Sequence, residues 1–182
     1  MTARGQPLLE KIKHIIMAAV VEICESNGAG ETITHDIANS NMGSVDAAEL
    51  VAVDNPIVAG DRSFAKYQRF HVTSMGGSSK IDNLKVWRTG ALGGAATHVG
   101  NQRTSGYVQK TYATPVATSI TNVDQAMPTS EPASQNLGIA GSLTGDLTAT
   151  GYSDYFVHQI ITNGADTAGA STTMNYQYDE TA

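Results

Sequence analysis

The chain contains a single cysteine, Cys24, among 182 residues. One cysteine cannot form an intrachain disulfide and cannot supply a cysteine-based metal cluster. Because free cysteines are usually buried, we predict that Cys24 is a small apolar core residue. An intermolecular disulfide is the alternative.

Charged side chains are also scarce, at 15% of the residues, and basic residues are fewer than acidic ones. The chain has 11 Lys and Arg against 17 Asp and Glu, which gives a formal net charge of −6. A nucleic-acid-binding protein neutralises phosphates with clustered Lys and Arg, whereas the basic residues here are scattered. We therefore expect no nucleic-acid partner. No run of about twenty apolar residues is present, so we expect no transmembrane helix and no membrane partner.

Sequence motifs that carry chemistry are absent as well. The chain has no phosphate-binding G-x-x-x-x-G-K-[ST], no G-x-G-x-x-G opening a helix after a strand, no G-x-S-x-G nucleophile elbow and no D-x-[DN]-x-[DN]-G calcium loop. A paired-carboxylate glycosidase stays open, because such pairs meet in space and not in sequence. A metal site would need ligands gathered from distant strands, because no two of the five histidines form H-x-H or H-x-x-x-H: His14, His35, His71, His98 and His158. We predict that the protein is not an enzyme and has no catalytic, cofactor-binding or metal-binding residues and no cofactor.

The sequence instead shows residue patterns typical of β-strands, together with 18 glycines. Residues 172–179 alternate strictly, with Thr172, Met174, Tyr176 and Tyr178 on one predicted face, which is typical of a strand with one packed and one wet side. Residues 155–162 are rich in aromatic and β-branched residues, which favour a strand. We predict that the two segments pair as a hairpin across a polar loop.

Further strands are expected along the rest of the chain. Residues 64–74 carry apolar groups on both faces, which predicts a central strand whose long polar side chains, Lys66 and Gln68 among them, lie along a covered or subunit-facing surface. We expect residues 75–79 to turn this strand into a hairpin with 80–89, where Trp87 is predicted to be a core residue. Other expected strands and connections are a first strand at 19–25, short segments at 31–34 and 45–53, a mobile loop at 90–106, a strand at 107–113 and a long connection at 115–145 with short strands at 120–122 and 139–144.

These elements predict an all-β fold, an antiparallel β-sandwich or jelly roll over residues 19–182. An N-terminal arm of residues 1–18 precedes it, helical or extended, with an amphipathic helix expected at about 8–17. The arm either packs on its own domain or docks on a neighbouring subunit. Jelly-roll and immunoglobulin-like strand orders both remain open, since both show the same alternation.

Several stretches resemble small structural virion proteins of tailed bacteriophages, which have a β-sandwich or jelly-roll look. The resemblance covers about residues 19–180, and residues 1–18 depart from it. The stretches are GETITHDIANSNMGSVDAAEL (30–50), PIVAGDRSFAKYQRFHVT (56–73), IDNLKVWRTG (81–90), MPTSEPASQNLGI (127–139), GYSDYFVHQI (151–160) and NYQYDE (175–180).

The resemblance implies a structural protein located in the virion, and it leads us to expect a decoration or cement protein on the capsid surface. Its expected partners are the major capsid protein or other virion proteins, together with copies of itself in a homo-oligomer. The contact surfaces that we expect are residues 1–18, 90–106 and 114–140. A tail, neck or baseplate component is the alternative within this class. A glycan-binding host-recognition module is the alternative of another class, with Tyr107, Tyr112, Tyr152 and Tyr155 as candidate binding residues.

Overall fold

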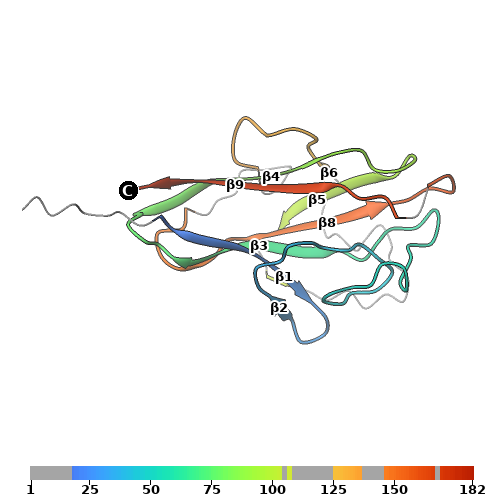
Figure 1. Cartoon of the computed structure of the whole chain (residues 1–182), viewed down its shortest axis with the longest axis horizontal. Coiled ribbons are helices and arrows are strands. Elements are labelled where there is room, and N and C mark those ends of the chain that lie inside the picture. The colour runs from blue at the N-terminus through green and yellow to red at the C-terminus, as the bar shows by residue number, and fades with distance from the viewer. Residues whose placement is uncertain (1–17, 104–105, 108–124, 137–145, 167–168) are drawn as a thin grey trace, which may run out of the picture.

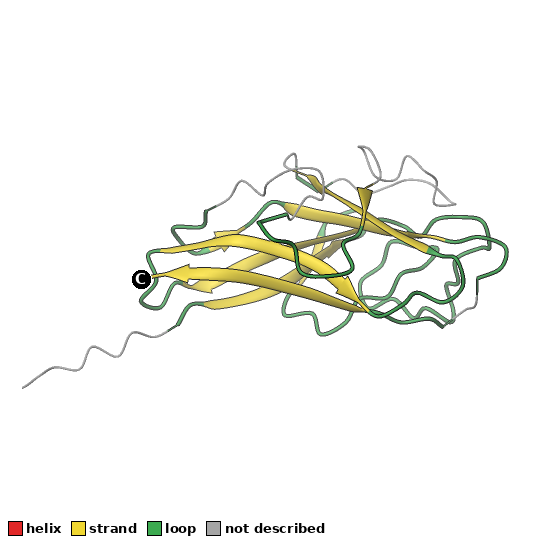
Figure 2. Cartoon of the chain, turned by 90° about the horizontal axis from the view of Figure 1, so that it is seen from above, coloured by secondary structure: helices red, strands yellow, loops and turns green. Residues whose placement is uncertain are grey.

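The computed structural model describes residues 18–103, 106–107, 125–136, 146–166 and 169–182. Over these ranges every regular element is a strand, and the strands form two antiparallel sheets, which confirms the predicted sandwich class (Figures 1 and 2). The larger sheet has the order β2-β1-β3-β8-β5-β6, with β7 paired to β3, and the smaller sheet is the pair β4-β9. The strands are β1 (Val20–Asn27), β2 (Thr32–Thr34), β3 (Lys66–Ser74), β4 (Lys80–Thr89), β5 (Thr97–Arg103), β6 (Gln125–Ala126), β7 (Gly151–Tyr152), β8 (Tyr155–Ile161) and β9 (Thr173–Thr181).

The apolar core lies between the two sheets. Phe70 and Val72 of β3 and Phe156 of β8 are at most 1% exposed. The small sheet contributes Ile81, Leu84 and Val86 of β4, together with Met174, Tyr176 and Tyr178 of β9. The Phe70 ring meets Tyr176 and Tyr178 edge-on, with centroid distances of 5.9 and 6.4 Å. The predicted packed face of the last strand is therefore confirmed at these three β9 positions.

Polar side chains occupy the other half of this interior. Lys66 is 1% exposed, and its Nζ donates to Glu25 Oε1 at 3.0 Å, Asn27 Oδ1 at 3.1 Å and the carbonyl oxygen of Ala47 at 3.0 Å. Gln68 is also 1% exposed and donates to Glu25 Oε2 at 2.9 Å. Because β3 is a central strand, the prediction that its long polar side chains are covered is confirmed.

A pair of buried histidines extends this polar network. His158 Nε2 lies 3.0 Å from Gln68 Oε1, and His158 Nδ1 lies 2.8 Å from His98 Nε2. The consistent assignment has both imidazoles neutral and protonated on Nε2, because Gln68 Oε1 can only accept a hydrogen bond. Burial lowers the pKa of His98 to about 2 and that of His158 to about 3.

Both expected hairpins are wrong. β3 and β4 lie in different sheets, and so do β8 and β9, so residues 75–79 and the chain between β8 and β9 cross from one layer to the other. β9 pairs instead with β4, with Val86 opposite Tyr176. The physical reason is that alternation specifies which face of a strand is buried and leaves open which strand is its neighbour.

The expected mobile loop at 90–106 is also wrong in its second half. Residues 97–103 form β5, an internal strand between β8 and β6, and His98, Val99 and Asn101 are buried. Residues 45–53 contain no strand. Trp87 is only half-buried.

The described part of the expected contact segment 114–140 packs on its own domain. β6 pairs with β5, and Asn136 covers the free edge of β4: its Oδ1 accepts from the Val86 amide at 3.0 Å and its Nδ2 donates to the Val86 carbonyl at 3.1 Å. Such side-chain pairing protects a sheet edge from other chains. The remaining predictions lie outside the described residues: most of the arm, including the helix at 8–17, the strand at 107–113 apart from Tyr107, and the short strands at 120–122 and 139–144.

Candidate functional site

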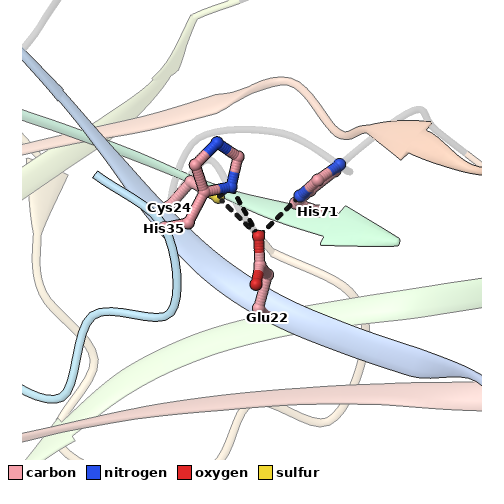
Figure 3. Close-up of side chains that lie close together, drawn as sticks. All are labelled: Glu22, Cys24, His35 and His71. Atoms are coloured by element: carbon pink, nitrogen blue, oxygen red, sulfur yellow. Dashed lines mark hydrogen bonds and ion pairs between the residues drawn. The ribbon is translucent and has the colours of Figure 1, made fainter. Parts of the chain in front are cut away.

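Four side chains with metal-binding atoms converge on the face of the large sheet that points away from the core: Glu22, Cys24, His35 and His71 (Figure 3). Glu22 and Cys24 are two residues apart on β1 and therefore lie on one face. His71 of β3 is the register partner of Glu22, which brings it to the same face. These three positions follow directly from the β1–β3 pairing.

His35 reaches the cluster from the segment that follows β2. β2 pairs back on β1, with Thr34 opposite Glu25, and the Ile37 amide donates to the Ile23 carbonyl at 3.0 Å. The chain turns between these two contacts at Asp36, which has a φ of 50°. This turn leaves the His35 imidazole beside Cys24.

The Glu22 carboxylate is the centre of the cluster. Its Oε1 lies 2.6 Å from His35 Nδ1 and 2.6 Å from His71 Nδ1, and Figure 3 shows both contacts converging on this oxygen. Cys24 Sγ lies 3.4 Å from the same oxygen and 3.3 Å from His35 Nδ1. One donor atom from each residue lies within 4.8 Å of all the others.

The electrostatics of the two acidic members differ. Hydrogen bonds from His71 and then His35 lower the pKa of the Glu22 carboxyl, so it is a carboxylate at neutral pH. Burial, followed by the hydrogen bond to Glu22, raises the pKa of the Cys24 thiol to about 12. The thiol is therefore protonated in the protein alone, and Cys24 is fully buried, as predicted.

Aromatic and cationic groups fix one side of the cluster. The Tyr152 ring stacks on His71 at a centroid distance of 4.1 Å and an interplanar angle of 13°. The Arg69 guanidinium lies 3.9 Å from the Tyr152 ring centroid, within cation–π range. These contacts hold the His71 imidazole in its orientation toward Glu22.

This cluster was not anticipated from the sequence. The one available signal was Glu22-x-Cys24, two donors on the same face of a predicted strand. The pairing with His71 and the return of His35 depend on the order of the strands, which no spacing motif records.

Of the three tyrosines proposed for glycan binding that the structure describes, one is exposed. Tyr155 is 3% exposed and belongs to a buried cluster with Tyr67 and Val157. Tyr107 is half-buried, and its hydroxyl oxygen lies 2.8 Å from Asp46 Oδ2. Tyr152 is 37% exposed, and Tyr112 lies outside the described residues.

No family model, curated protein or solved structure matches the chain. In the described ranges, no helix is long and apolar enough to cross a membrane.

Proposed function

We propose that the protein is a structural component of a tailed-phage virion, a decoration or cement protein that packs on the head lattice. The observation that carries the proposal is the resemblance to small virion proteins, which covers about residues 19–180. The two-layer sandwich supports it as a rigid unit that can be repeated over a lattice. Many weak contacts to the assembled shell then stabilise the particle by mass action.

Exposed apolar side chains in one loop support an assembly role. Val51, Val53 and Val58 are 52%, 84% and 62% exposed and lie within eight residues of each other. A contiguous exposed apolar patch marks an interaction site, and we propose that these three side chains contribute to one. We propose this loop as a second contact surface, in addition to the arm of residues 1–18. The strand at 97–103 is largely buried and is removed from the set of expected contact surfaces, whereas residues 125–136 include exposed positions and stay in it.

Removal of the arm tests the proposal. We expect a variant lacking residues 1–18 to keep the far-ultraviolet circular dichroism of the sandwich and to lose binding to particles that lack this chain. Val53→Ser with Val58→Ser, which alters only exposed side chains, should weaken the same binding. If the variant without residues 1–18 binds the particles as well as the full-length protein does, the proposal that the arm attaches the protein to the particle is wrong.

A glycan-binding module is the less favoured proposal. Of the four tyrosines named for it, Tyr152 is the exposed one in the described part of the chain, and its ring already contacts His71 and Arg69. Glycan-array binding that disappears with Tyr152→Ala would favour this alternative over assembly.

A further inference from the structure

We propose that Glu22, Cys24, His35 and His71 form a binding site for one zinc ion. The inference does not depend on the virion role, because it rests only on the geometry of these four side chains. They offer one sulfur, two imidazole nitrogens and one carboxylate oxygen, which are the donor types of protein zinc sites. Hard cations such as magnesium and calcium prefer oxygen ligands, so the sulfur and the imidazoles select against them.

The spacing of the donor atoms fits a tetrahedral ion after small movements. Zinc–ligand distances of about 2.0–2.3 Å place neighbouring ligand atoms about 3.3–3.6 Å apart at tetrahedral angles. The Cys24 Sγ distances of 3.4 Å to Glu22 Oε1 and 3.3 Å to His35 Nδ1 already lie at this value. The two 2.6 Å contacts of Glu22 Oε1 with the imidazoles must lengthen by less than about 1 Å. The pairs of His71 Nδ1 with Cys24 Sγ and with His35 Nδ1 lie within 4.8 Å and must close by at most about 1.5 Å, and side-chain rotation supplies both changes.

The cluster is buried and held in place on one side and open to solvent on the other. Cys24 is fully buried, and the His71 ring is held by stacking on Tyr152. His35 has a side chain that is 47% exposed, so an ion can enter from solvent on that side. A bound ion would link β1 and β3 to the segment after β2 and so clamp the edge of the large sheet.

Zinc binding would change the protonation of three of the four side chains and balance their charge. The Cys24 thiol releases its proton to solvent and binds as thiolate, and the Nδ1 proton of each imidazole moves to Nε2 or to solvent so that Nδ1 can coordinate. The two imidazoles would exchange their hydrogen bonds to Glu22 for bonds to the ion, and the carboxylate would supply the fourth ligand. The ion and two anionic ligands leave no net charge in the cluster.

Cobalt(II), a spectroscopic substitute for zinc, tests the site in the full-length reduced protein. We expect saturation at one cobalt per chain, with a thiolate-to-cobalt charge-transfer band and the intense visible bands of tetrahedral cobalt. One equivalent of zinc should remove both. Cys24→Ser should remove the charge-transfer band. His35→Ala, which changes an exposed residue, should lower the affinity by more than about ten-fold, since even outer-shell changes at metal sites cost that much.

A neighbouring residue provides the matched control. Asp36→Asn removes an exposed carboxylate next to His35 without removing a ligand, and Asn tolerates the positive φ. This variant should bind cobalt as the unaltered protein does. At one zinc concentration, the ion should also raise the unfolding temperature of the unaltered protein more than that of His35→Ala. Octahedral cobalt without a charge-transfer band, or an unchanged affinity in His35→Ala, would overturn the proposal even if Cys24→Ser fails to fold.

Discussion

Removal of the buried Lys66 ammonium should be among the most damaging single changes to the fold. Lys66→Met keeps a similar volume, so the cost comes from electrostatics more than from a cavity. It leaves the Glu25 carboxylate, whose side chain is 6% exposed, without its cation, and leaves Asn27 Oδ1 and the Ala47 carbonyl without this donor. Removal of one partner of a buried ion pair costs about 3–5 kcal/mol. Hydrogen bonds to Glu25 from Asn27 and Gln68 remain in the variant. We therefore expect the free energy of unfolding to fall by about 3 kcal/mol, the lower end of this range.

Urea unfolding, followed by Trp87 fluorescence and circular dichroism, measures this loss. Lys85→Met is the matched control, because Lys85 is also buried but its partner Glu131, 2.8 Å away, has a side chain that is 51% exposed and remains hydrated. We expect the control to lose about 1 kcal/mol or less from the broken pair. Lys66→Met combined with Glu25→Gln should be more stable than the sum of the two single losses predicts. Equal losses in Lys66→Met and Lys85→Met would refute the reasoning.

Two further predictions concern acid stability and a tight turn. His98 and His158 have folded pKa values of about 2 and about 3, below the ordinary 6.5, so their contribution is complete above about pH 6.5 and falls as the pH drops toward 3, by up to about 1.4 kcal/mol per pH unit for each. The urea midpoint should decrease between about pH 6.5 and about pH 4, and a flat profile would contradict the neutral assignment. Gly94→Ala should destabilise by about 1–3 kcal/mol, because φ is +66° and the new Cβ would lie 2.9 Å from Asp166 Cα. A thermal midpoint equal to that of the unaltered protein would show that the turn relaxes without cost.

The local part of the fold could be predicted from the sequence, and the pairing could not. The alternation in residues 172–179 and the two apolar faces of residues 64–74 identified β9 and the central β3, because the period of the pattern is a local property. The crossing of the chain between β3 and β4 looks like a hairpin turn in sequence, since glycine and serine suit both. β5 was missed because its glycine and polar residues lack an apolar alternation. Its buried side chains lie against distant residues, Val99 in the cluster with Tyr67 and Tyr155 and His98 beside His158.

The donor cluster shows the same limit. Glu22 and Cys24 lie on one face of a strand that the sequence does predict, but His35 and His71 join them only through the pairing of β1 with β2 and β3. The buried Lys66–Glu25 pair was anticipated only as a covered polar side chain. Its partner could not be named, because the residues are 41 positions apart and meet through sheet register.

The proposed virion role is tested most directly by the copy number of this chain in purified particles, which must contain the chain if the proposal holds. Quantitative mass spectrometry against the major capsid protein provides the ratio. A decoration protein should be present at about one copy per capsid subunit, or at a fixed fraction of that number, whereas a handful of copies per particle would place it in the tail, neck or baseplate. Absence of the chain from the particles would contradict the proposed structural role.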